Sequence, residues 1–347
     1  MWLENPIFRE DMEYIAGVDF VPWETLRGKT LFITGATGLI GFNLISALAY
    51  MNLKRNIPLK IIALVRDETK AGERFAEILA EGAPLEFVLG DLEHIPHVDE
   101  KVDYIIHGGS PTASRYFAEH PVDTIQMNLA GATTLLEMAK DKQVESFLFL
   151  SSMEVYGSLH REEKVDEVHE SFVNTMNPRS SYPEVKRMVE AMCASYAAQY
   201  NVPAKVIRLT QTFGAGVRKE DNRVYAQFMR SAMAGEDIVL LTPGGTRRSY
   251  LYTADAVTAI LTALLKGKNG EAYNAANEDT YCSIKEMAEL VARIKNINVV
   301  VKLSNESNKL YPAELYMNLS TKKIRNFEWE PKVSIQEMFV RMMRACE

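Results

Sequence analysis

The sequence of 347 residues predicts an α/β protein, in which a doubly wound parallel sheet is joined to a smaller mixed lobe near the C-terminus. Two observations predict this fold class. Short apolar runs of strand length alternate with helix-periodic stretches over about the first 210 residues, and a glycine-rich turn joins the first run to a helix. Because parallel strands need crossover connections, which are usually helical, the alternation indicates a parallel sheet with helices on both faces.

The expected elements begin with a short helix opened by Asn5-Pro6, because Asn caps helices well and Pro suits the first helical position. Six strands are expected after it, at residues 31–33, 59–65, 85–89, 102–106, 147–150 and 204–209. Helices are expected between them, at residues 41–48, 73–81, 122–142 and 180–200. Such a sheet binds its ligands outside the carboxyl ends of its strands.

The glycine-rich turn after the first strand has the spacing of a dinucleotide-binding turn. Gly35 can adopt a positive φ, Gly38 lets backbone N–H groups approach a pyrophosphate, and Gly41 lets the helix pack closely on the strand. The N-terminus of that helix then faces the phosphates. The residues expected at the cofactor here are Gly35, Thr37, Gly38, Leu39, Ile40 and Gly41. A tight turn that binds nothing is the alternative, but the flanking strand and helix favour a dinucleotide.

The chain is therefore expected to divide around this site. Residues 28–210 and 253–275 are predicted to form a dinucleotide-binding domain. Residues 211–252 and 276–347 are predicted to form the smaller, substrate-binding lobe, and residues 1–27 an N-terminal extension. The substrate should lie in the cleft between the two parts.

Composition narrows the classes of function. The chain has 47% hydrophobic and 24% charged residues, and its net charge of −7 argues against a nucleic-acid partner. No apolar run reaches the length of a membrane span, and the first residues do not resemble a signal peptide. The three cysteines are scattered, which fits a reducing compartment, so we expect a cytoplasmic protein. His94 and His97 suit a solvated loop, and we expect no metal site.

Residues after the second and third strands bear on which dinucleotide binds. An acidic residue at the end of the second strand usually holds the ribose of NAD, whereas an arginine accommodates the 2′-phosphate of NADP. Arg66 stands at this point and favours NADP slightly, while Asp67 keeps NAD open. A surface Arg-Asp pair is the alternative. Asp91 and Leu92 follow the third strand and could border the adenine, though a plain turn also explains them.

Tyr182 and Lys186 have the spacing of a catalytic pair, because residues four apart lie on one face of a helix. A lysine beside a tyrosine favours the phenolate and would lower the tyrosine pKa, which makes the phenol a usable acid or base. Two other pairs share this spacing, Tyr50 with Lys54 and Tyr281 with Lys285. Tyr182 differs because its helix follows a strand that ends in Ser151-Ser152, at the ligand-binding edge of the sheet.

The sequence resembles the extended short-chain dehydrogenases/reductases that modify nucleotide sugars. The motifs that carry the resemblance are TGATGLIG at 34–41, SSMEVYG at 151–157, SYPEVKRMVE at 181–190 and TFGAG at 212–216. Within this family the chain looks most similar to the UDP-glucuronate decarboxylase branch, through HGGSPTASRYFAEHP, NPRSSYPEVKRMVEAMCASY and DNRVYAQFMRSAMAGEDIVL. The resemblance implies a Rossmann-type fold, an NAD or NADP cofactor and a homodimer formed by the helices around Tyr182 and residues 127–140.

The resemblance also implies roles for the catalytic residues. Ser152 would hydrogen-bond the sugar oxygen that is oxidised or reduced, and Tyr182 would transfer its proton. Lys186 would bind the nicotinamide ribose and tune Tyr182. Glu154 stands where dehydratases and the decarboxylase carry a catalytic Glu, so it could serve a second proton transfer. A solvated Glu at the rim of the site is the alternative.

For the substrate, the resemblance implies that Arg223 and Arg248 clamp the diphosphate, a role that suits planar guanidinium groups. Ser110 and Gln211 are expected at the sugar and nucleotide. Between residues 217 and 248 there are six Lys or Arg against four Asp or Glu, which suits an anionic substrate. Without the resemblance, this stretch would be an ordinary solvated helix face.

Several residues depart from the family pattern around the substrate. Gln211 replaces the usual Asn, Ala215 the usual Pro, and Met153 the usual Asp or Ser, while Arg66 is unusual for enzymes that recycle a bound NAD. Three hypotheses therefore stay open. The protein could decarboxylate, dehydrate or epimerise a nucleotide sugar through a recycled cofactor, in surface polysaccharide synthesis. It could instead be an NADPH-dependent reductase of a nucleotide-activated ketose such as a CDP-ketose, which QTFGAG suggests, or a non-catalytic dinucleotide-binding protein.

Overall fold

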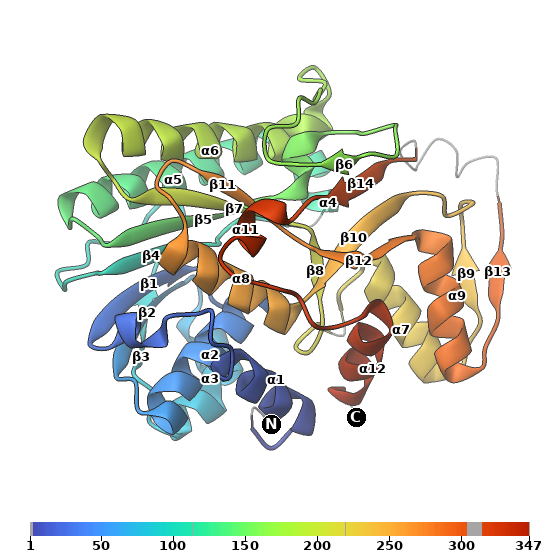
Figure 1. The fold of residues 1–347 in the computed structure, drawn as a ribbon, viewed down its shortest axis with the longest axis horizontal. Helices are drawn as coiled ribbons and strands as arrows, with labels where there is room; N and C mark the ends of the chain where they lie inside the picture. Colours follow the sequence, from blue (N-terminus) through green and yellow to red (C-terminus); the bar gives the residue numbers. More distant parts are fainter. Residues whose placement is uncertain (1–2, 113, 219, 304–313, 347) are drawn as a thin grey trace.

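The computed structural model describes residues 3–112, 114–218, 220–303 and 314–346 and is built around a seven-stranded sheet (Figure 1). The strand order is β11-β7-β5-β4-β1-β2-β3, and all neighbours are parallel. The strands are β1 Lys29–Thr34, β2 Leu59–Val65, β3 Leu85–Leu89, β4 Tyr104–His107, β5 Ser146–Ser152, β7 Ala204–Leu209 and β11 Ala272–Ala275. The order reverses between β1 and β4, so the predicted doubly wound fold is confirmed.

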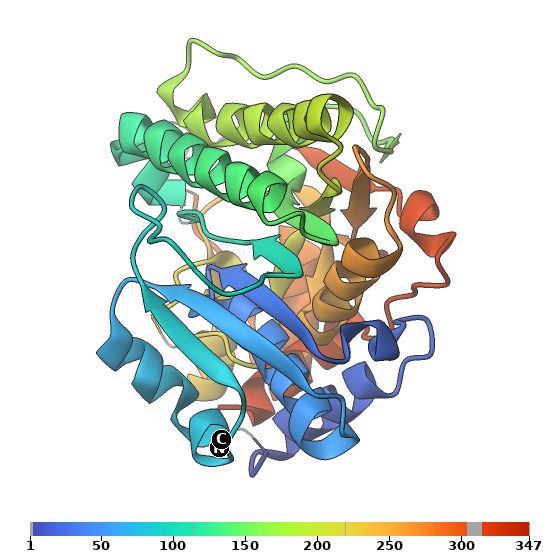
Figure 2. The ribbon, with the colours of Figure 1, turned by 90° about the vertical axis from the view of Figure 1, so that its left-hand side faces the viewer.

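Helices cover both faces of this sheet (Figure 2). On one face lie α1 Pro6–Ala16, α2 Leu39–Arg55, α3 Glu68–Ala80 and α8 Thr253–Lys266; on the other lie α4 Ser114–Glu119, α5 Pro121–Asp141 and α6 Ser181–Tyr200. The alternation along β1 explains the two layers, because Leu31 and Ile33 enter one apolar core and Phe32 enters the other.

A smaller set of strands and helices adjoins the carboxyl ends of the large sheet. A second sheet has the order β12-β10-β14-β6, with β8 paired to β10, and β13 pairs with β9. The second sheet consists of β6 Lys164–Val165, β8 Gln211–Phe213, β10 Arg247–Tyr252, β12 Asn277–Ser283 and β14 Tyr316–Leu319, and a separate two-stranded sheet consists of β9 Ile238–Leu240 and β13 Val299–Val301. The helices with these sheets are α7 Val224–Ala234, α9 Ile284–Lys295, α11 Lys322–Arg325 and α12 Ile335–Arg344. Three short 3-10 helices complete the fold, η1 Trp23–Leu26, η2 Met153–Tyr156 and η3 Pro178–Ser180.

Most predicted elements are confirmed, although the first residue of several of them differs from the expected one. The strands predicted at 59–65, 85–89 and 204–209 have those bounds. The helix predicted at 73–81 begins earlier, at Glu68, because the Asp67 side chain caps it by accepting the Lys70 N–H at 3.0 Å. The strand predicted at 102–106 runs from Tyr104 to His107. Residues 253–275 contribute α8 and β11 to the large sheet and its cover, while the division into domains stays a prediction.

The N-terminal helix is fixed by buried polar contacts to α12, β10 and α8. Asn5 caps α1 as predicted, its side chain accepting the Ile7 N–H. The Tyr252 hydroxyl donates to Asp11 at 2.7 Å, and Arg341 of α12 forms an ion pair with Asp11 at 3.0 Å. The two ends of the chain consequently lie on the same side of the molecule (Figure 1).

This contact predicts a pH-dependent loss of stability in Arg341→Met. Burial raises the pKa of Asp11 to about 7. The carboxyl therefore stays neutral in the folded protein in mild acid, while it ionises in the unfolded chain, and this difference lowers the stability as the pH rises towards about 7. Removing the guanidinium raises that pKa further. Below about pH 7 the free energy of unfolding of variant and wild type therefore falls with rising pH at the same rate. Above about pH 7 it continues to fall in the variant only, so the difference between the two proteins grows by at most about 1.4 kcal/mol per pH unit.

Urea unfolding at several pH values measures this difference in the free energy of unfolding. Arg344→Met removes an exposed arginine from the same helix and should leave the pH dependence unchanged. A gap between Arg341→Met and wild type that is the same in mild acid and in mild alkali would contradict the prediction.

Candidate active site

The glycine turn between β1 and α2 has the geometry that a bound pyrophosphate needs. Gly35 has a φ of 73°, and a Cβ there would lie 2.5 Å from the carbonyl oxygen of Gly108. A Cβ on Gly41 would lie 2.2 Å from the carbonyl oxygen of Gly35. Gly38 caps α2 without a side-chain hydrogen bond, so the N–H groups of the first helical turn are left for a ligand. The residues of the turn therefore fit a dinucleotide phosphate.

Arg66 and Asp67 follow the end of β2, and they differ in whether they already have a partner. Arg66 is exposed and makes no ion pair within the part of the chain that the structure describes. Asp67 caps α3, and one of its oxygens lies 2.9 Å from the ammonium of Lys70. The carboxylate that would suit an NAD ribose is thus already held by the helix that follows.

Asp91 and Leu92 lie at the carboxyl end of β3 and have structural partners. Asp91 Oδ1 accepts the backbone N–H groups of Glu93 and His94 at 2.9 and 2.8 Å, which is the plain turn left open above. These bonds hold its pKa below the usual value. Leu92 is buried, and a Cβ on Gly109 would lie 2.9 Å from its side chain.

Tyr182 lies in the first turn of α6, buried beside the end of β5. The side chain of Ser152, the last residue of β5, lies near its phenol and lowers the pKa of that group. Its ring stacks on Phe117 of α4, with 4.6 Å between the ring centres. The ammonium of Lys186 lies 5.6 Å from the centre of the Tyr182 ring and donates to the carbonyl oxygen of Leu150 at 3.0 Å. The structure therefore brings Ser152, Tyr182 and Lys186 together.

The electrostatics of this group differ from the expectation. Burial raises the pKa of Tyr182, and the negative charge of Glu154 raises it further. The contact with Ser152 and the charges of Arg179 and Arg223 lower it, but they do not outweigh burial. The expectation that Lys186 brings this pKa below its usual value is therefore wrong for this structure. Burial also lowers the pKa of Lys186, to about 7, which weakens its positive charge near neutrality.

Glu154 lies in η2, directly after Ser152, and is held by an arginine that the sequence reasoning missed. Arg179 Nη1 lies 3.1 Å from Glu154 Oε2, and the Arg179 guanidinium also lies over the ring of Phe117. The Glu154 side chain is 29% exposed, so it is half-buried, and its role stays a prediction. The available signal was the NPRSSY stretch, in which Arg179 stands three residues before Tyr182.

A buried hydrogen-bond network around Glu190, which the sequence did not predict, contacts Ser151 and lies one helical turn from Lys186. The Ser151 hydroxyl donates to Glu190 at 2.6 Å, and Arg208 of β7 forms an ion pair with Glu190 at 2.6 Å. Glu190 lies one turn after Lys186, and its charge favours the protonated form of that lysine. The carboxyl end of β5 and the first turns of α6 are thereby joined by charged hydrogen bonds.

The expected substrate residues form two separate groups. Arg223 precedes α7 and is paired with Asp221, with Nε 3.0 Å from Oδ1, and its charge acts on Tyr182. Arg248 of β10 and Gln211 of β8 lie side by side, with Nη1 and Oε1 3.5 Å apart, and Arg248 Nε is buried without a partner in the described chain. Ser110, shortly after β4, donates to the carbonyl oxygen of Pro111. No contact between described residues joins Arg248 to Tyr182.

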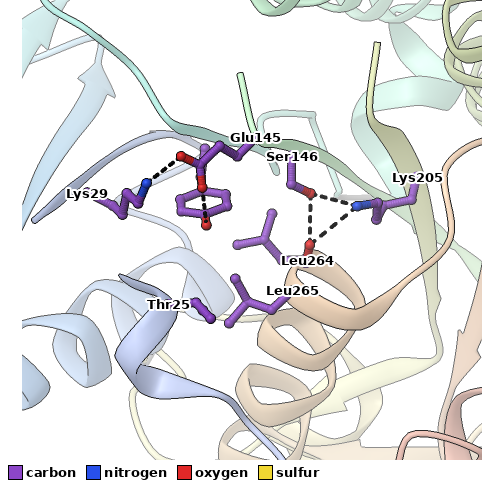
Figure 3. A pocket seen from close by; sticks show the side chains of 8 residues that line it. Thr25, Lys29, Glu145, Ser146, Lys205, Leu264 and Leu265 are labelled. Atoms are coloured by element: carbon purple, nitrogen blue, oxygen red, sulfur yellow. Dashed lines mark hydrogen bonds and ion pairs between the residues drawn. The ribbon is translucent and has the colours of Figure 1, made fainter. Parts of the chain in front are cut away.

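A depression among the described residues lies elsewhere, at the amino ends of the strands (Figure 3). It measures about 330 Å³, and Lys205 lies in its wall. The Lys205 ammonium donates to Ser146 Oγ at 2.9 Å and approaches the carbonyl oxygen of Leu264 at 3.4 Å. Leu264 belongs to the last turn of α8, so Lys205 satisfies a helix C-terminus. This depression has a structural explanation and lies at the edge opposite the glycine turn.

Metal-binding clusters and membrane-spanning helices are both absent from the described residues. No group of three His, Cys, Asp or Glu side chains there could hold a metal ion. Within the same ranges, no helix has the length and apolarity needed to cross a membrane. His94 and His97 are exposed, as expected, with side chains 85% and 83% accessible.

Solved structures with the same fold include nucleotide-sugar enzymes. One is the UDP-glucose 4-epimerase of Thermotoga maritima with UDP-glucose, which has a TM-score of 0.75 at 20% identity and covers 91% of this chain and 98% of the other. Another is the dTDP-glucose 4,6-dehydratase of Bacillus anthracis in complex with NAD, with a TM-score of 0.75 at 21% identity, covering 92% and 96%. At 20% and 21% identity, the similarity to these structures shows that the fold is shared.

Comparison of sequences agrees with the motifs. UDP-glucuronic acid decarboxylase 6 of Arabidopsis thaliana is 28% identical over 311 residues, covering 88% of this chain and 85% of the relative. Human dTDP-D-glucose 4,6-dehydratase is 27% identical over 329 residues, covering 91% and 90%. The model of the NAD dependent epimerase/dehydratase family matches residues 31–276, which include the glycine turn, Ser152 and Tyr182. The resemblance given by the motifs is thus confirmed, and the chain belongs to the NAD-dependent epimerase/dehydratase family.

Proposed function

We propose that this protein changes the sugar of a nucleotide-diphosphate sugar by hydride transfer, with NAD or NADP as its cofactor. The observation that carries the proposal is the buried contact between Ser152 and Tyr182, beside Lys186 and at the edge of the sheet that carries the glycine turn. The names of the relatives support it, since they are decarboxylases and a dehydratase of UDP- and dTDP-sugars.

In this proposal Ser152 and Tyr182 act on the same sugar oxygen. Tyr182 takes the hydroxyl proton when the sugar is oxidised and returns it on reduction, while the Ser152 hydroxyl orients that oxygen. The dinucleotide, when bound, accepts or supplies the hydride. Lys186 binds its ribose, and the charges of Arg179 and Arg223 favour the phenolate. Phe117 covers the Tyr182 ring and keeps water away from the phenol.

Glu154 is proposed as a second proton-transfer group after oxidation of the sugar. Its ion pair with Arg179 holds the carboxylate beside Ser152 and Tyr182. A reaction that recycles its cofactor, such as decarboxylation, dehydration or epimerisation, needs such a group in addition to Tyr182. Arg223 and Arg248 are proposed to bind the substrate diphosphate; the buried, unpartnered Nε of Arg248 supports this role. Ser110 and Gln211 are proposed at the sugar and nucleotide.

A second candidate is a net reductase that consumes NADPH and reduces a nucleotide-activated ketose. The observation that favours it is the state of the β2 end, where Arg66 is unpaired among the described residues and Asp67 is held as a helix cap. Because a net reductase draws on the NADPH pool, an arginine at this position suits it. A non-catalytic dinucleotide-binding protein is a third candidate, and the assembled Ser152, Tyr182 and Lys186 speak against it.

We further propose a cytoplasmic homodimer that serves surface polysaccharide synthesis. Exposed apolar side chains on α5 and α6 support a dimer, namely Val122, Ile125 and Met188, because such surfaces are usually covered. Light scattering on the purified protein tests this assembly. A monomer at micromolar concentration would contradict it.

The function is tested by incubating the enzyme with reduced or oxidised cofactor and a panel of UDP-, dTDP-, GDP- and CDP-sugars, read by mass spectrometry. Loss of carbon dioxide identifies decarboxylation, loss of water identifies dehydration, and gain of two hydrogens identifies reduction. Epimerisation leaves the mass unchanged and is identified by chromatographic separation of the two epimers. Stoichiometric loss of NADPH absorbance separates the reductase from an enzyme that recycles its cofactor. If no nucleotide sugar changes while the cofactor binds, the proposal is wrong and the non-catalytic candidate gains support.

A further inference from the structure

The loop at residues 214–218, which follows β8, crosses the first turns of α2. Three side chains fasten it there. Asn43 of α2 donates to the Ala215 carbonyl oxygen at 3.2 Å, and Arg74 of α3 donates to the Gly216 carbonyl oxygen at 3.3 Å. Arg218 Nη2 in turn donates to the Thr37 carbonyl oxygen, within the glycine turn, at 2.9 Å. The loop therefore brings two guanidinium groups to the edge of the glycine turn.

These two arginines lack the partners that arginines usually have. Neither Arg74 nor Arg218 forms an ion pair with a carboxylate anywhere in the described residues. Arg74 Nε is buried and has no hydrogen-bond partner there, while its guanidinium lies 4.1 Å from the centre of the Phe42 ring. Burial and the charge of Arg218 together lower the pKa of Arg74 to about 10. Two like charges side by side, one with a buried free donor, form a site for an anion.

The position of the pair points to a particular anion. Arg74 is on α3, the helix that begins directly after the end of β2, and Arg218 touches Thr37 of the glycine turn. In a doubly wound sheet the adenosine ribose lies between these two segments. Arg66, at the end of β2, adds a third guanidinium, and Asp67 contributes no free carboxylate because it caps α3. The surroundings of the ribose therefore suit an additional phosphate.

We propose that Arg74 and Arg218, together with Arg66, bind the phosphate on the adenosine ribose, so that the protein selects NADP over NAD. The proposal rests on the proposed function, in that a dinucleotide lies across the glycine turn. It adds two residues from separate elements, α3 and the 214–218 loop, to the single arginine that the sequence indicates. It also makes the loop part of the cofactor site, because Arg74 and Arg218 fasten the loop as well as facing the phosphate.

A purely structural role for both arginines is the competing explanation. In that case Arg74 and Arg218 only fasten the loop, and removing either weakens every dinucleotide to the same degree because the glycine turn itself is disturbed. Selection of the phosphate predicts a different result. The loss should then be confined to ligands that carry the phosphate on the adenosine ribose, since NAD makes no such contact.

Isothermal titration calorimetry without any sugar substrate distinguishes selection of the phosphate from a purely structural role of the arginines. NADP, NAD and the fragments 2′,5′-ADP and 5′-AMP are titrated into wild type, Arg74→Gln, Arg218→Gln and Arg66→Gln. We expect wild type to bind NADP and 2′,5′-ADP at least about tenfold more tightly than NAD and 5′-AMP. Each variant should lose about tenfold for the phosphorylated ligands only, and less at high salt because the contact is ionic.

Arg55→Gln is the matched control, since Arg55 is exposed at the last residue of α2, about 24 Å along the helix from the glycine turn. It should leave all four affinities unchanged, and thermal melting verifies that every variant is folded. Equal binding of NADP and NAD by wild type would overturn the proposal while leaving the proposed function intact. An equal loss for all ligands in the folded variants would also overturn it, in favour of the structural role. If wild type binds no dinucleotide at all, the proposed function fails together with it.

Discussion

Tyr182→Phe should reduce the turnover of the nucleotide-sugar substrate by about a thousandfold while dinucleotide binding is retained. In the proposed function the phenol exchanges a proton with the sugar oxygen, and the Ser152 side chain lies near it. Loss of one hydroxyl leaves the ring and its stacking on Phe117 in place. The change should therefore appear in kcat rather than in the affinity for cofactor, and it is measured by steady-state kinetics and calorimetry on the same protein.

Tyr196→Phe is the matched control for this variant. Tyr196 lies on the same helix, about 21 Å farther along, and its hydroxyl donates to Glu137 of α5. Its loss should leave kcat unchanged. If Tyr182→Phe keeps the turnover of the wild type, the proton passes through another group, and the assignment of Ser152, Tyr182 and Lys186 fails with it.

Gly41→Ala should abolish measurable dinucleotide binding and lower the free energy of unfolding by about 1 to 3 kcal/mol. The added methyl group would lie 2.2 Å from the Gly35 carbonyl oxygen and 2.8 Å from that of Ala36. Both neighbours are backbone, so they cannot rotate away, and the turn must open. Opening moves the first N–H groups of α2 away from the pyrophosphate. Calorimetric titration and urea unfolding measure the two effects.

Gly72→Ala is the matched control for Gly41→Ala, and it should raise the stability instead of lowering it. Gly72 lies within α3, and nothing stands within 4 Å of a Cβ there. Alanine should therefore stabilise the helix by about 0.5 to 1 kcal/mol and leave binding unchanged. Normal cofactor affinity in Gly41→Ala would show that the turn does not hold the phosphates.

The large sheet could be predicted because its signals are local. The apolar run at 59–65 has strand length and is followed at once by residues that start a helix, so both of its ends are marked in the sequence. Asn5-Pro6 marks the start of α1 in the same way. Asp67 carried a comparable signal, and its role as cap shows why its carboxylate does not remain free for a ribose.

Contacts between distant segments could not be predicted from such signals. Arg179 pairs with Glu154 because η3 and η2 meet, and Phe117 reaches Tyr182 from a different helix. The pKa of Tyr182 was misjudged for a related reason, since spacing reveals a lysine neighbour but does not reveal how completely a phenol is buried. The strands of the smaller lobe are short, as with Gln211–Phe213, and their pairing depends on residues far away in the chain.

Transfer of deuterium from substrate to cofactor tests the central claim most directly. The nucleotide sugar identified in the panel is prepared with deuterium on the carbon that is oxidised, mixed with enzyme holding oxidised cofactor, and quenched within one turnover in cold alkali, in which the reduced cofactor is stable. The account predicts that the recovered cofactor carries deuterium with wild type and none with Tyr182→Phe. Product formed by the wild type without deuterium in the cofactor at any time would contradict it; for a net reductase, the labelled cofactor is used instead and the deuterium must appear in the product.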